Sequence, residues 1–433
     1  MPSHFREWTA NGNWAELVSL ARNLDPILNA FVQFGEPVAS VRGALSGLPY
    51  VVKDIFAAPD RQPFGGLAQA LPSLDCEYAD VLRLLDNAGA ARLGYTALTE
   101  IAYEPSGYNA VRGRVRNPWN PDFISGGSSS GSAAAVASGS AVVALGSDTG
   151  GSLRIPAHAC GITAWKPTWG VVSTRGAMPL APTLDTIGLL ARGAAELMPA
   201  AEVLADLKDG APVRTGVVVR DALDAAHPSV RKACQGGVEA IASCVVSLDR
   251  RDGLAAIDAA DAPVLTIMQG EAARCHRALL EGDAIGPVLR RRLAKGLAID
   301  DATLANAAAQ RPALAAAFIE GVMRSADVVI LPVMTIRTPP AAECDPPDQA
   351  FRPRTLYEIS RLTRFVNMLG FPAVALPVGF DDRGLPVALQ VVGRPGMDRA
   401  LLSLAAAVQA RSDWHDRVPD ALASLVASHG VTE

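Results

Sequence analysis

A stretch rich in serine and glycine, residues 125–152, constrains the fold of this chain more than any other feature. It holds seven glycines and nine serines in 28 positions, but residues 133–137 and 141–145 within it are rich in alanine and valine. A helix with side chains this small can be buried on all sides, with glycine-rich turns at both ends. The stretch therefore predicts buried helical structure over these two runs rather than a flexible linker.

Periodic apolar residues elsewhere predict an α/β fold. Three- and four-residue spacing predicts helices over 14–31 (with a break at Pro26), 81–88 and 399–410, and alanine-rich helices over 195–325. Short apolar runs predict strands at 48–52, 90–93, 216–219, 327–333, 373–378 and 387–392. The last two are close enough in sequence to form an antiparallel hairpin, so the expected sheet is mixed.

The composition excludes several classes of protein. Of the 433 residues, 49% are hydrophobic and 19% are charged, which excludes a mainly disordered chain, and no apolar run approaches ~18 residues, which excludes a transmembrane helix. The net charge of −5 argues against a nucleic-acid partner. The six cysteines contain no CxxC pair, which argues against a zinc site and a disulfide framework. Residues 1–16 lack the apolar run of a signal peptide, so we expect a cytoplasmic protein.

Lys53 is the first candidate for chemistry. It follows the apolar run 48–52, so we expect it at the end of a buried strand. Burial disfavours the charged form of lysine and lowers its pKa, so a buried Lys53 could act as a base. The alternative is a lysine that extends to solvent or pairs with Asp54.

Two known motifs fit the serine- and glycine-rich stretch incompletely. Gly126 and Gly131 have the spacing of a phosphate-binding loop, but Ser132 stands where that loop needs a lysine. Residues 127–131 match the Gly-x-Ser-x-Gly nucleophile elbow with Ser129 as nucleophile, but two prolines interrupt the strand that should precede it. A purely structural role, in which the turns hold helices in place, stays open.

A lysine-based relay would use both ends of the stretch together with Lys53. Gly150 and Gly151 allow successive backbone N–H groups to converge, so residues 149–152 could form an oxyanion hole beside Ser152 as nucleophile. Ser128 would then pass the proton of Ser152 to the neutral lysine, and no histidine is needed.

The chain resembles the amidase signature family. The resemblance rests on residues 47–54 (GLPYVVKD), 126–136 (GGSSSGSAAAV), 146–156 (GSDTGGSLRIP), 166–168 (KPT), 179–188 (PLAPTLDTIG), 370–377 (GFPAVALP) and 384–390 (GLPVALQ), which follow the family's order over most of the chain. It implies a single large domain with a central mixed, twisted β-sheet covered by helices on both faces. The expected segments are an N-terminal helical segment (1–40), a signature core (41–195), a variable helical region that contributes to the pocket (196–325) and C-terminal strands with a helix (326–433).

The resemblance also implies roles for individual residues. Lys53 would be the base, Ser152 the acylated nucleophile, and Ser128 the relay serine that follows a cis peptide bond. The oxyanion donors would be Thr149, Gly150 and Gly151, and no cofactor or metal is implied. Asp148 and Arg154 are expected to form scaffolding around the site. We expect substrate contacts from Tyr103, Gly127, Met178 and His158, although packing is the first interpretation of His158.

The predicted function is therefore hydrolysis of the C–N bond of a small amide or ureido substrate, with release of ammonia or an amine. One alternative is the A-type component of a glutamine-dependent tRNA amidotransferase, which would need partner subunits. Another is a non-catalytic scaffold of the same fold. The expected partner is a small-molecule amide, with neither nucleic acid nor membrane, and a homodimer is compatible with the family.

Overall fold

A computed structural model of the chain describes residues 14–35, 42–59, 61–72, 74, 76–419 and 422. Residues 1–13, most of the segment that lacks the apolar run of a signal peptide, lie outside these ranges. Within them, none of the helices is long and apolar enough to cross a membrane.

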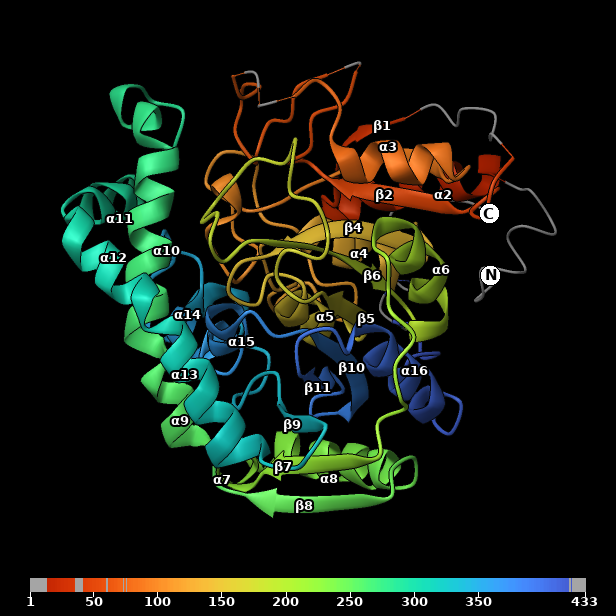
Figure 1. Ribbon diagram of the computed structural model, residues 1–433. Helices are drawn as coiled ribbons and strands as arrows, with labels where there is room; N and C mark the ends of the chain where they lie inside the picture. Colours follow the sequence, from red (N-terminus) through yellow and green to blue (C-terminus); the bar gives the residue numbers. More distant parts are fainter. Residues whose placement is uncertain are drawn as a thin grey trace.

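One mixed sheet of eleven strands runs through the molecule (Figure 1). Its spatial order is β1-β3-β2-β4-β6-β5-β10-β11-β9-β7-β8. The strands are β1 Phe31–Phe34, β2 Pro49–Lys53, β3 Ala91–Thr96, β4 Val143–Asp148, β5 Thr163–Lys166, β6 Thr186–Ala191, β7 Thr215–Val219, β8 Ser247–Arg251, β9 Val328–Pro332, β10 Ala373–Phe380 and β11 Pro386–Gly393. Neighbours β2/β3, β2/β4, β7/β8 and β7/β9 are parallel, and the other pairs are antiparallel. The expected mixed sheet and the hairpin of β10 and β11 are confirmed.

Helices cover both faces of this sheet. The α-helices are α2 Trp14–Leu28, α3 Asp80–Asn87, α4 Ser130–Ala137, α5 Arg154–Cys160, α6 Ala194–Leu204, α7 Arg220–Asp224, α8 Pro228–Ala242, α9 Leu254–Ala259, α10 Asp261–Cys275, α11 Pro287–Leu297, α12 Asp301–Ala309, α13 Arg311–Phe318, α14 Pro353–Ser360, α15 Arg364–Leu369 and α16 Asp398–Gln409. Short 3-10 turns lie at Glu100–Ala102, Arg277–Glu281 and Ala341–Glu343, and a π-helical turn at Ile319–Met323 follows α13.

Alternation along the strands assigns the two faces. In β4, Val143 and Leu145 belong to one apolar cluster, which also contains residues of α3, α6, α8 and α16, whereas Ala144 packs with α2, α4 and α5 in another. Successive strand residues point to opposite faces, so each face buries its own helical layer. A third cluster joins α9, α10, α13 and α15 to the sheet beside β9, and this helical group forms the left side of Figure 1.

The structure corrects the interpretation of residues 141–145. Helix α4 is buried at all eight positions, as expected, but it ends at Ala137, and the second small-residue run begins strand β4. A turn at Ser138 and Gly139 follows the helix, and residues 143–145 then pair with β2. Alanine and valine suit either structure when both sides are buried, so composition alone could not separate a helix from a strand here.

Other elements also differ from the sequence expectations, and strands β5 and β6 were not predicted. Phe31, which we placed in the first helix, opens strand β1, and α2 continues two residues past Pro26 before it ends at Leu28. The region 196–325 is mostly helical and contains the expected strand at 216–219, but it also contains β8, which the sequence analysis missed. Strand β8 is an edge strand whose residues are exposed or half-buried, so it has no apolar pattern to detect.

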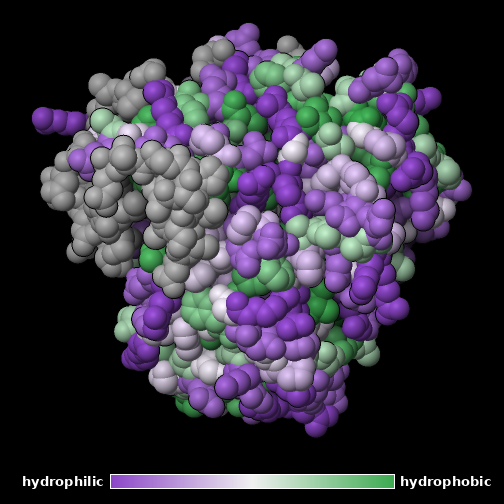
Figure 2. All heavy atoms as spheres, turned by 180° about the vertical axis from the view of Figure 1, so that it is seen from behind, coloured by the Kyte–Doolittle hydropathy of each residue, from purple (hydrophilic) through white to green (hydrophobic). Residues whose placement is uncertain are grey.

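The surface mixes polar and apolar side chains. Figure 2 shows the face behind that of Figure 1, where, outside the grey atoms, hydrophobic residues are scattered among hydrophilic ones. Scattered apolar residues are ordinary for a protein surface. Most of the large apolar side chains of the described residues are buried in the core instead.

Candidate active site

The ends of two adjacent parallel strands define the site. β2 ends at Lys53 and β4 ends at Asp148, and the strands pair in parallel. Carboxyl ends of parallel neighbours lie at the same edge of a sheet, and ligand sites of α/β proteins commonly form there. The loops that follow β4 and precede α4 carry the serines of the predicted relay.

Lys53 is fully buried at this edge. Its Nζ donates hydrogen bonds to Ser128 Oγ at 2.7 Å and to Ser147 Oγ at 2.8 Å. Burial lowers the pKa of Lys53 to about 7, against the opposing charges of Asp148 and Asp185. Lys53 is therefore uncharged in a large fraction of molecules at neutral pH. It neither extends to solvent nor pairs with Asp54, whose carboxylate binds Arg61 instead.

Ser128 lies just before α4, and the peptide bond between Gly127 and Ser128 is cis. The next residue, Ser129, donates its backbone N–H to the carbonyl of Ser152 at 3.2 Å, which brings the loop of Ser152 against the loop of Ser128. Gly127 is required by packing, because a Cβ there would meet the Glu104 carbonyl at 2.7 Å. Its own N–H donates to the Pro105 carbonyl, and Gly127 is not among the residues that line the main cavity described below.

Ser152 lies between β4 and α5 and lines the main cavity of the site, together with Thr149, Gly150 and Tyr103. Helices α10, α11 and α14 supply most of the opposite wall. The cavity is small, with a volume of about 110 Å³, and it opens to solvent. Its size restricts the ligand to a small molecule.

The loop 149–152 offers backbone donors to this cavity, but not the set that we predicted. The Gly151 N–H donates to Asp148 Oδ1 at 2.8 Å and is therefore occupied. The backbone N–H groups of Thr149, Gly150 and Ser152 have no hydrogen-bond partner among the residues that the structure describes. Free amides that converge can stabilise a developing oxyanion, and the free set of this loop differs from the predicted one because it holds Ser152 and lacks Gly151.

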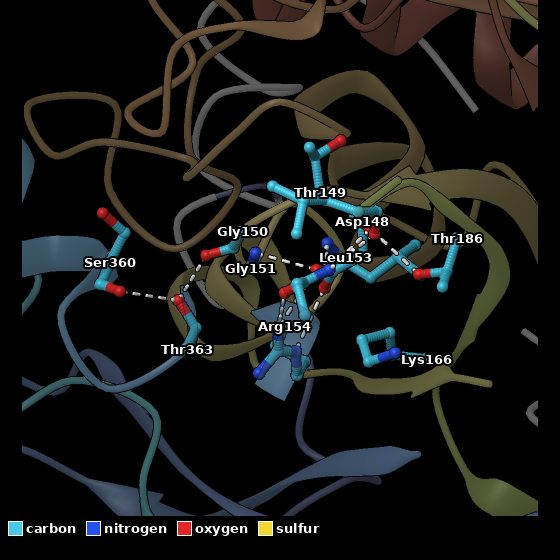
Figure 3. A network of polar contacts seen from close by, with 12 residues as sticks. Asp148, Thr149, Gly150, Gly151, Leu153, Arg154, Lys166, Thr186, Ser360 and Thr363 are labelled. Atoms are coloured by element: carbon cyan, nitrogen blue, oxygen red, sulfur yellow. Dashed lines mark hydrogen bonds and ion pairs between the residues drawn. The ribbon is translucent and has the colours of Figure 1, made fainter. Parts of the chain in front are cut away.

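A buried ion pair holds this loop in place (Figure 3). The Arg154 guanidinium donates to both oxygens of Asp148 and also to Gln390 and Asn367. Burial by itself would raise the pKa of Asp148, but Arg154 outweighs it and lowers the pKa to about 2. Asp148 thus stays ionised and accepts the N–H groups of Gly151 and Leu153, which is the scaffolding role expected for this pair.

Arg154→Ala is expected to lower the free energy of unfolding by about 3–5 kcal/mol, because it leaves the buried Asp148 carboxylate without its cation. Urea unfolding at pH 7 measures this loss. The matched control is Arg220→Ala, which breaks an ion pair with Asp252 whose side chains are 56% and 57% exposed. The urea midpoint of Arg220→Ala should stay close to that of wild type. Equal shifts in the two variants would contradict the scaffolding role.

The remaining predicted substrate contacts divide into two groups. Tyr103 lines the main cavity, whereas Met178 lines two other cavities, one of which shares Thr149 and Leu180 with the main cavity. His158 is fully buried in α5, and the Ala388 N–H donates to its Nδ1. Burial lowers the pKa of His158 to about 4, so it is neutral and packs against β11, away from the cavity.

The alternative nucleophile Ser129 does not line the cavity. It is fully buried, and its Oγ donates to the Ser147 carbonyl at 3.2 Å. The nucleophile-elbow interpretation therefore has no geometric support.

Two residues of the site escaped the sequence analysis. Ser147 accepts the second hydrogen bond of Lys53, and Asp185 accepts the Thr149 hydroxyl at 2.6 Å and so fixes the cavity wall. Only the position of Ser147 inside the segment 146–156 could have drawn attention to it. No metal-binding group of three or more His, Cys, Asp or Glu side chains occurs within the described ranges.

Comparisons with known proteins show what the chain as a whole is similar to. A family model described as Amidase matches residues 32–402. The A-type component of glutamyl-tRNA(Gln) amidotransferase from Thiobacillus denitrificans is 30% identical over 468 residues, which cover 92% of this chain and 93% of the relative. A crystal structure of an amidase is 32% identical with a TM-score of 0.82 and covers 91% of this chain and 95% of its own. The corresponding amidotransferase component from Thermotoga maritima is 25% identical with a TM-score of 0.78, covering 92% of this chain and 91% of its own.

Proposed function

The chain belongs to the amidase family, and from this premise we propose that it hydrolyses the C–N bond of a small amide through an acyl-enzyme on Ser152. Lys53 is the base and Ser128 passes the proton between them. The observation that carries the proposal is the hydrogen bond from fully buried Lys53 to Ser128, beside the cavity that Ser152 lines.

In the first half-reaction, Ser152 Oγ attacks the amide carbonyl. Its proton moves to Ser128 Oγ while the Ser128 proton moves to the neutral Nζ of Lys53, so the lysine becomes an ammonium. The negative charge on the substrate oxygen is stabilised by the N–H groups of Thr149, Gly150 and Ser152. The same relay, run in reverse, protonates the leaving nitrogen as the C–N bond breaks.

In the second half-reaction, water attacks the acyl-enzyme. The relay takes a proton from the water and returns one to Ser152 Oγ, so the products are a carboxylic acid and ammonia or an amine. Ser147 supports both halves, because its hydroxyl accepts from Nζ and holds the amine toward Ser128. Each step needs only groups of this chain, the substrate and water.

A second candidate function is that of a glutamine-hydrolysing component of an amidotransferase. It is favoured by the amidotransferase relatives, which match this chain along nearly its whole length. In that case the ammonia released from glutamine would pass to a partner protein. The chemistry at Ser152 would be the same, and only the substrate and the acceptor of ammonia would differ.

Ammonia release across a substrate panel tests the proposal. The panel contains glutamine, malonamate, succinamate, biuret-type ureides, and aliphatic and aryl amides, each with wild type and with Ser152→Ala. Release that the variant loses supports an amidohydrolase and identifies its substrate group. Release from glutamine alone would favour the second candidate. Release that persists in Ser152→Ala would overturn the assignment of the nucleophile.

A further inference from the structure

The main cavity carries an uneven distribution of charge. Four ionisable side chains that can carry charge at neutral pH line it, namely Glu104, Arg292, Lys295 and Arg364. Arg364 is committed elsewhere, because its guanidinium binds Asp261, the Ser360 hydroxyl and the Tyr357 carbonyl. It therefore belongs to the wall.

Arg292 and Lys295 have fewer partners within the protein than Arg364. Arg292 donates one hydrogen bond, to the Tyr103 carbonyl at 3.2 Å, and lies over the Tyr103 ring. Neither Arg292 nor Lys295 forms an ion pair among the described residues. The two stand three positions apart on α11, so they share one face of the helix, and both line the cavity.

Glu104 does not neutralise this pair of cations. Its carboxylate already accepts the backbone N–H groups of Ser106, Gly107 and Tyr108. Burial raises the pKa of Glu104 to about 7, although Arg292 opposes the rise. Glu104 is the one carboxylate among the described residues that line the cavity, and about half of it is protonated near pH 7.

Apolar side chains line the cavity together with the cations and the nucleophile. Ile155, Leu180, Leu265 and Met268 line the same cavity as Ser152. Such walls favour a short hydrocarbon chain between the two polar ends of a ligand. A guanidinium with free donors suits the planar carboxylate, which it can bind through two parallel hydrogen bonds.

We propose that the substrate is an amide whose acyl part ends in a carboxylate, which Arg292 binds directly and Lys295 attracts at the cavity mouth. The inference rests on the proposed function and names its substrate class, the monoamide of a dicarboxylic acid or a close analogue. The two cations are specificity-determining residues, because a neutral amide of equal length gains nothing from them.

Paired substrates test the proposal. Succinamate and butyramide have the same chain length, and only the first carries a carboxylate. Wild type is expected to prefer succinamate in kcat/KM. Arg292→Gln should reduce that preference about 100-fold, mainly through KM, and Lys295→Gln should reduce it less because its side chain is exposed. Arg292→Lys should restore part of the preference. Lys232→Gln, which removes an exposed lysine on α8, serves as the control and should leave the preference as in wild type.

Binding of dicarboxylates separates this inference from the proposed function. Calorimetry with Ser152→Ala and malonate, succinate or glutarate should detect binding that Arg292→Gln, added to Ser152→Ala, weakens. Dicarboxylate binding that Arg292→Gln weakens, without any hydrolysis, would remove the proposed function and leave standing only the carboxylate site at Arg292. Hydrolysis of butyramide as efficient as that of succinamate, with no loss of dicarboxylate binding in Arg292→Gln, would overturn the inference while the proposed function stands.

Discussion

Replacement of Ser152 by alanine is expected to lower kcat for amide hydrolysis by ~10⁴-fold or more. Ser152 lines the cavity and lies on the loop with the free N–H groups of Thr149 and Gly150. The other hydroxyl of this loop that lines the cavity, that of Thr149, already donates to Asp185. Without its Oγ no acyl-enzyme can form, and Ser128 and Lys53 have no proton to relay. Initial rates of ammonia release, with wild type and variant at equal concentration, measure the loss.

Ser130→Ala is the matched control for this experiment. Ser130 lies in the same serine-rich stretch and is fully buried in α4, but its Oγ has no hydrogen-bond partner. Alanine there removes a buried unsatisfied hydroxyl, so both activity and stability should be retained or improved. A serine-reactive fluorophosphonate should label wild type and Ser130→Ala but not Ser152→Ala. Labelling of Ser152→Ala at another serine would contradict the assignment.

The positions of the candidate catalytic residues could be anticipated because the family resemblance rests on the locally distinctive segments in which they lie. Lys53 ends a short apolar run, and a polar residue at that point can only end a strand or be buried with a partner. Ser128 and Ser152 lie at the two ends of a stretch whose middle is too small and apolar to be a linker. The structure brings the loops of these three residues together at one edge of the sheet.

Other features depend on contacts between distant segments, which local patterns do not encode. Gly151 was a reasonable oxyanion donor until its N–H was found on the Asp148 carboxylate. Asp185 fixes Thr149 across 36 positions of sequence, and Arg292 reaches the cavity from a helical region that has no recognisable motif. For His158 packing was the first interpretation and substrate contact the second, and only the packing of α5 against β11 shows which of the two applies.

The pH dependence of kcat/KM should show the protonation of Lys53. Burial lowers the pKa of this amine to about 7, and only the uncharged form can accept the Ser128 proton. Activity should therefore rise about tenfold per pH unit below pH 7 and level off above it. The value of kcat/KM should fall toward acid pH because Lys53 acts as a base, and below pH 7 most Lys53 side chains are protonated and cannot accept a proton.

Lys53→Met tests whether this inflection belongs to Lys53. It should lower kcat/KM about 10³-fold at pH 7 and remove the inflection, with a smaller loss at high pH, where hydroxide can serve as base. Lys53→Arg should not rescue activity, because a guanidinium stays protonated.

Lys166 is the necessary control for this experiment. Burial lowers the pKa of Lys166 to about 7 as well, but its Nζ donates to the Pro167 carbonyl and Lys166 does not line the cavity. Lys166→Met should keep the inflection near pH 7. If Lys166→Met abolished the inflection and Lys53→Met retained it, the base would have to be reassigned, because burial alone would then have produced the low pKa of Lys53 without a catalytic role.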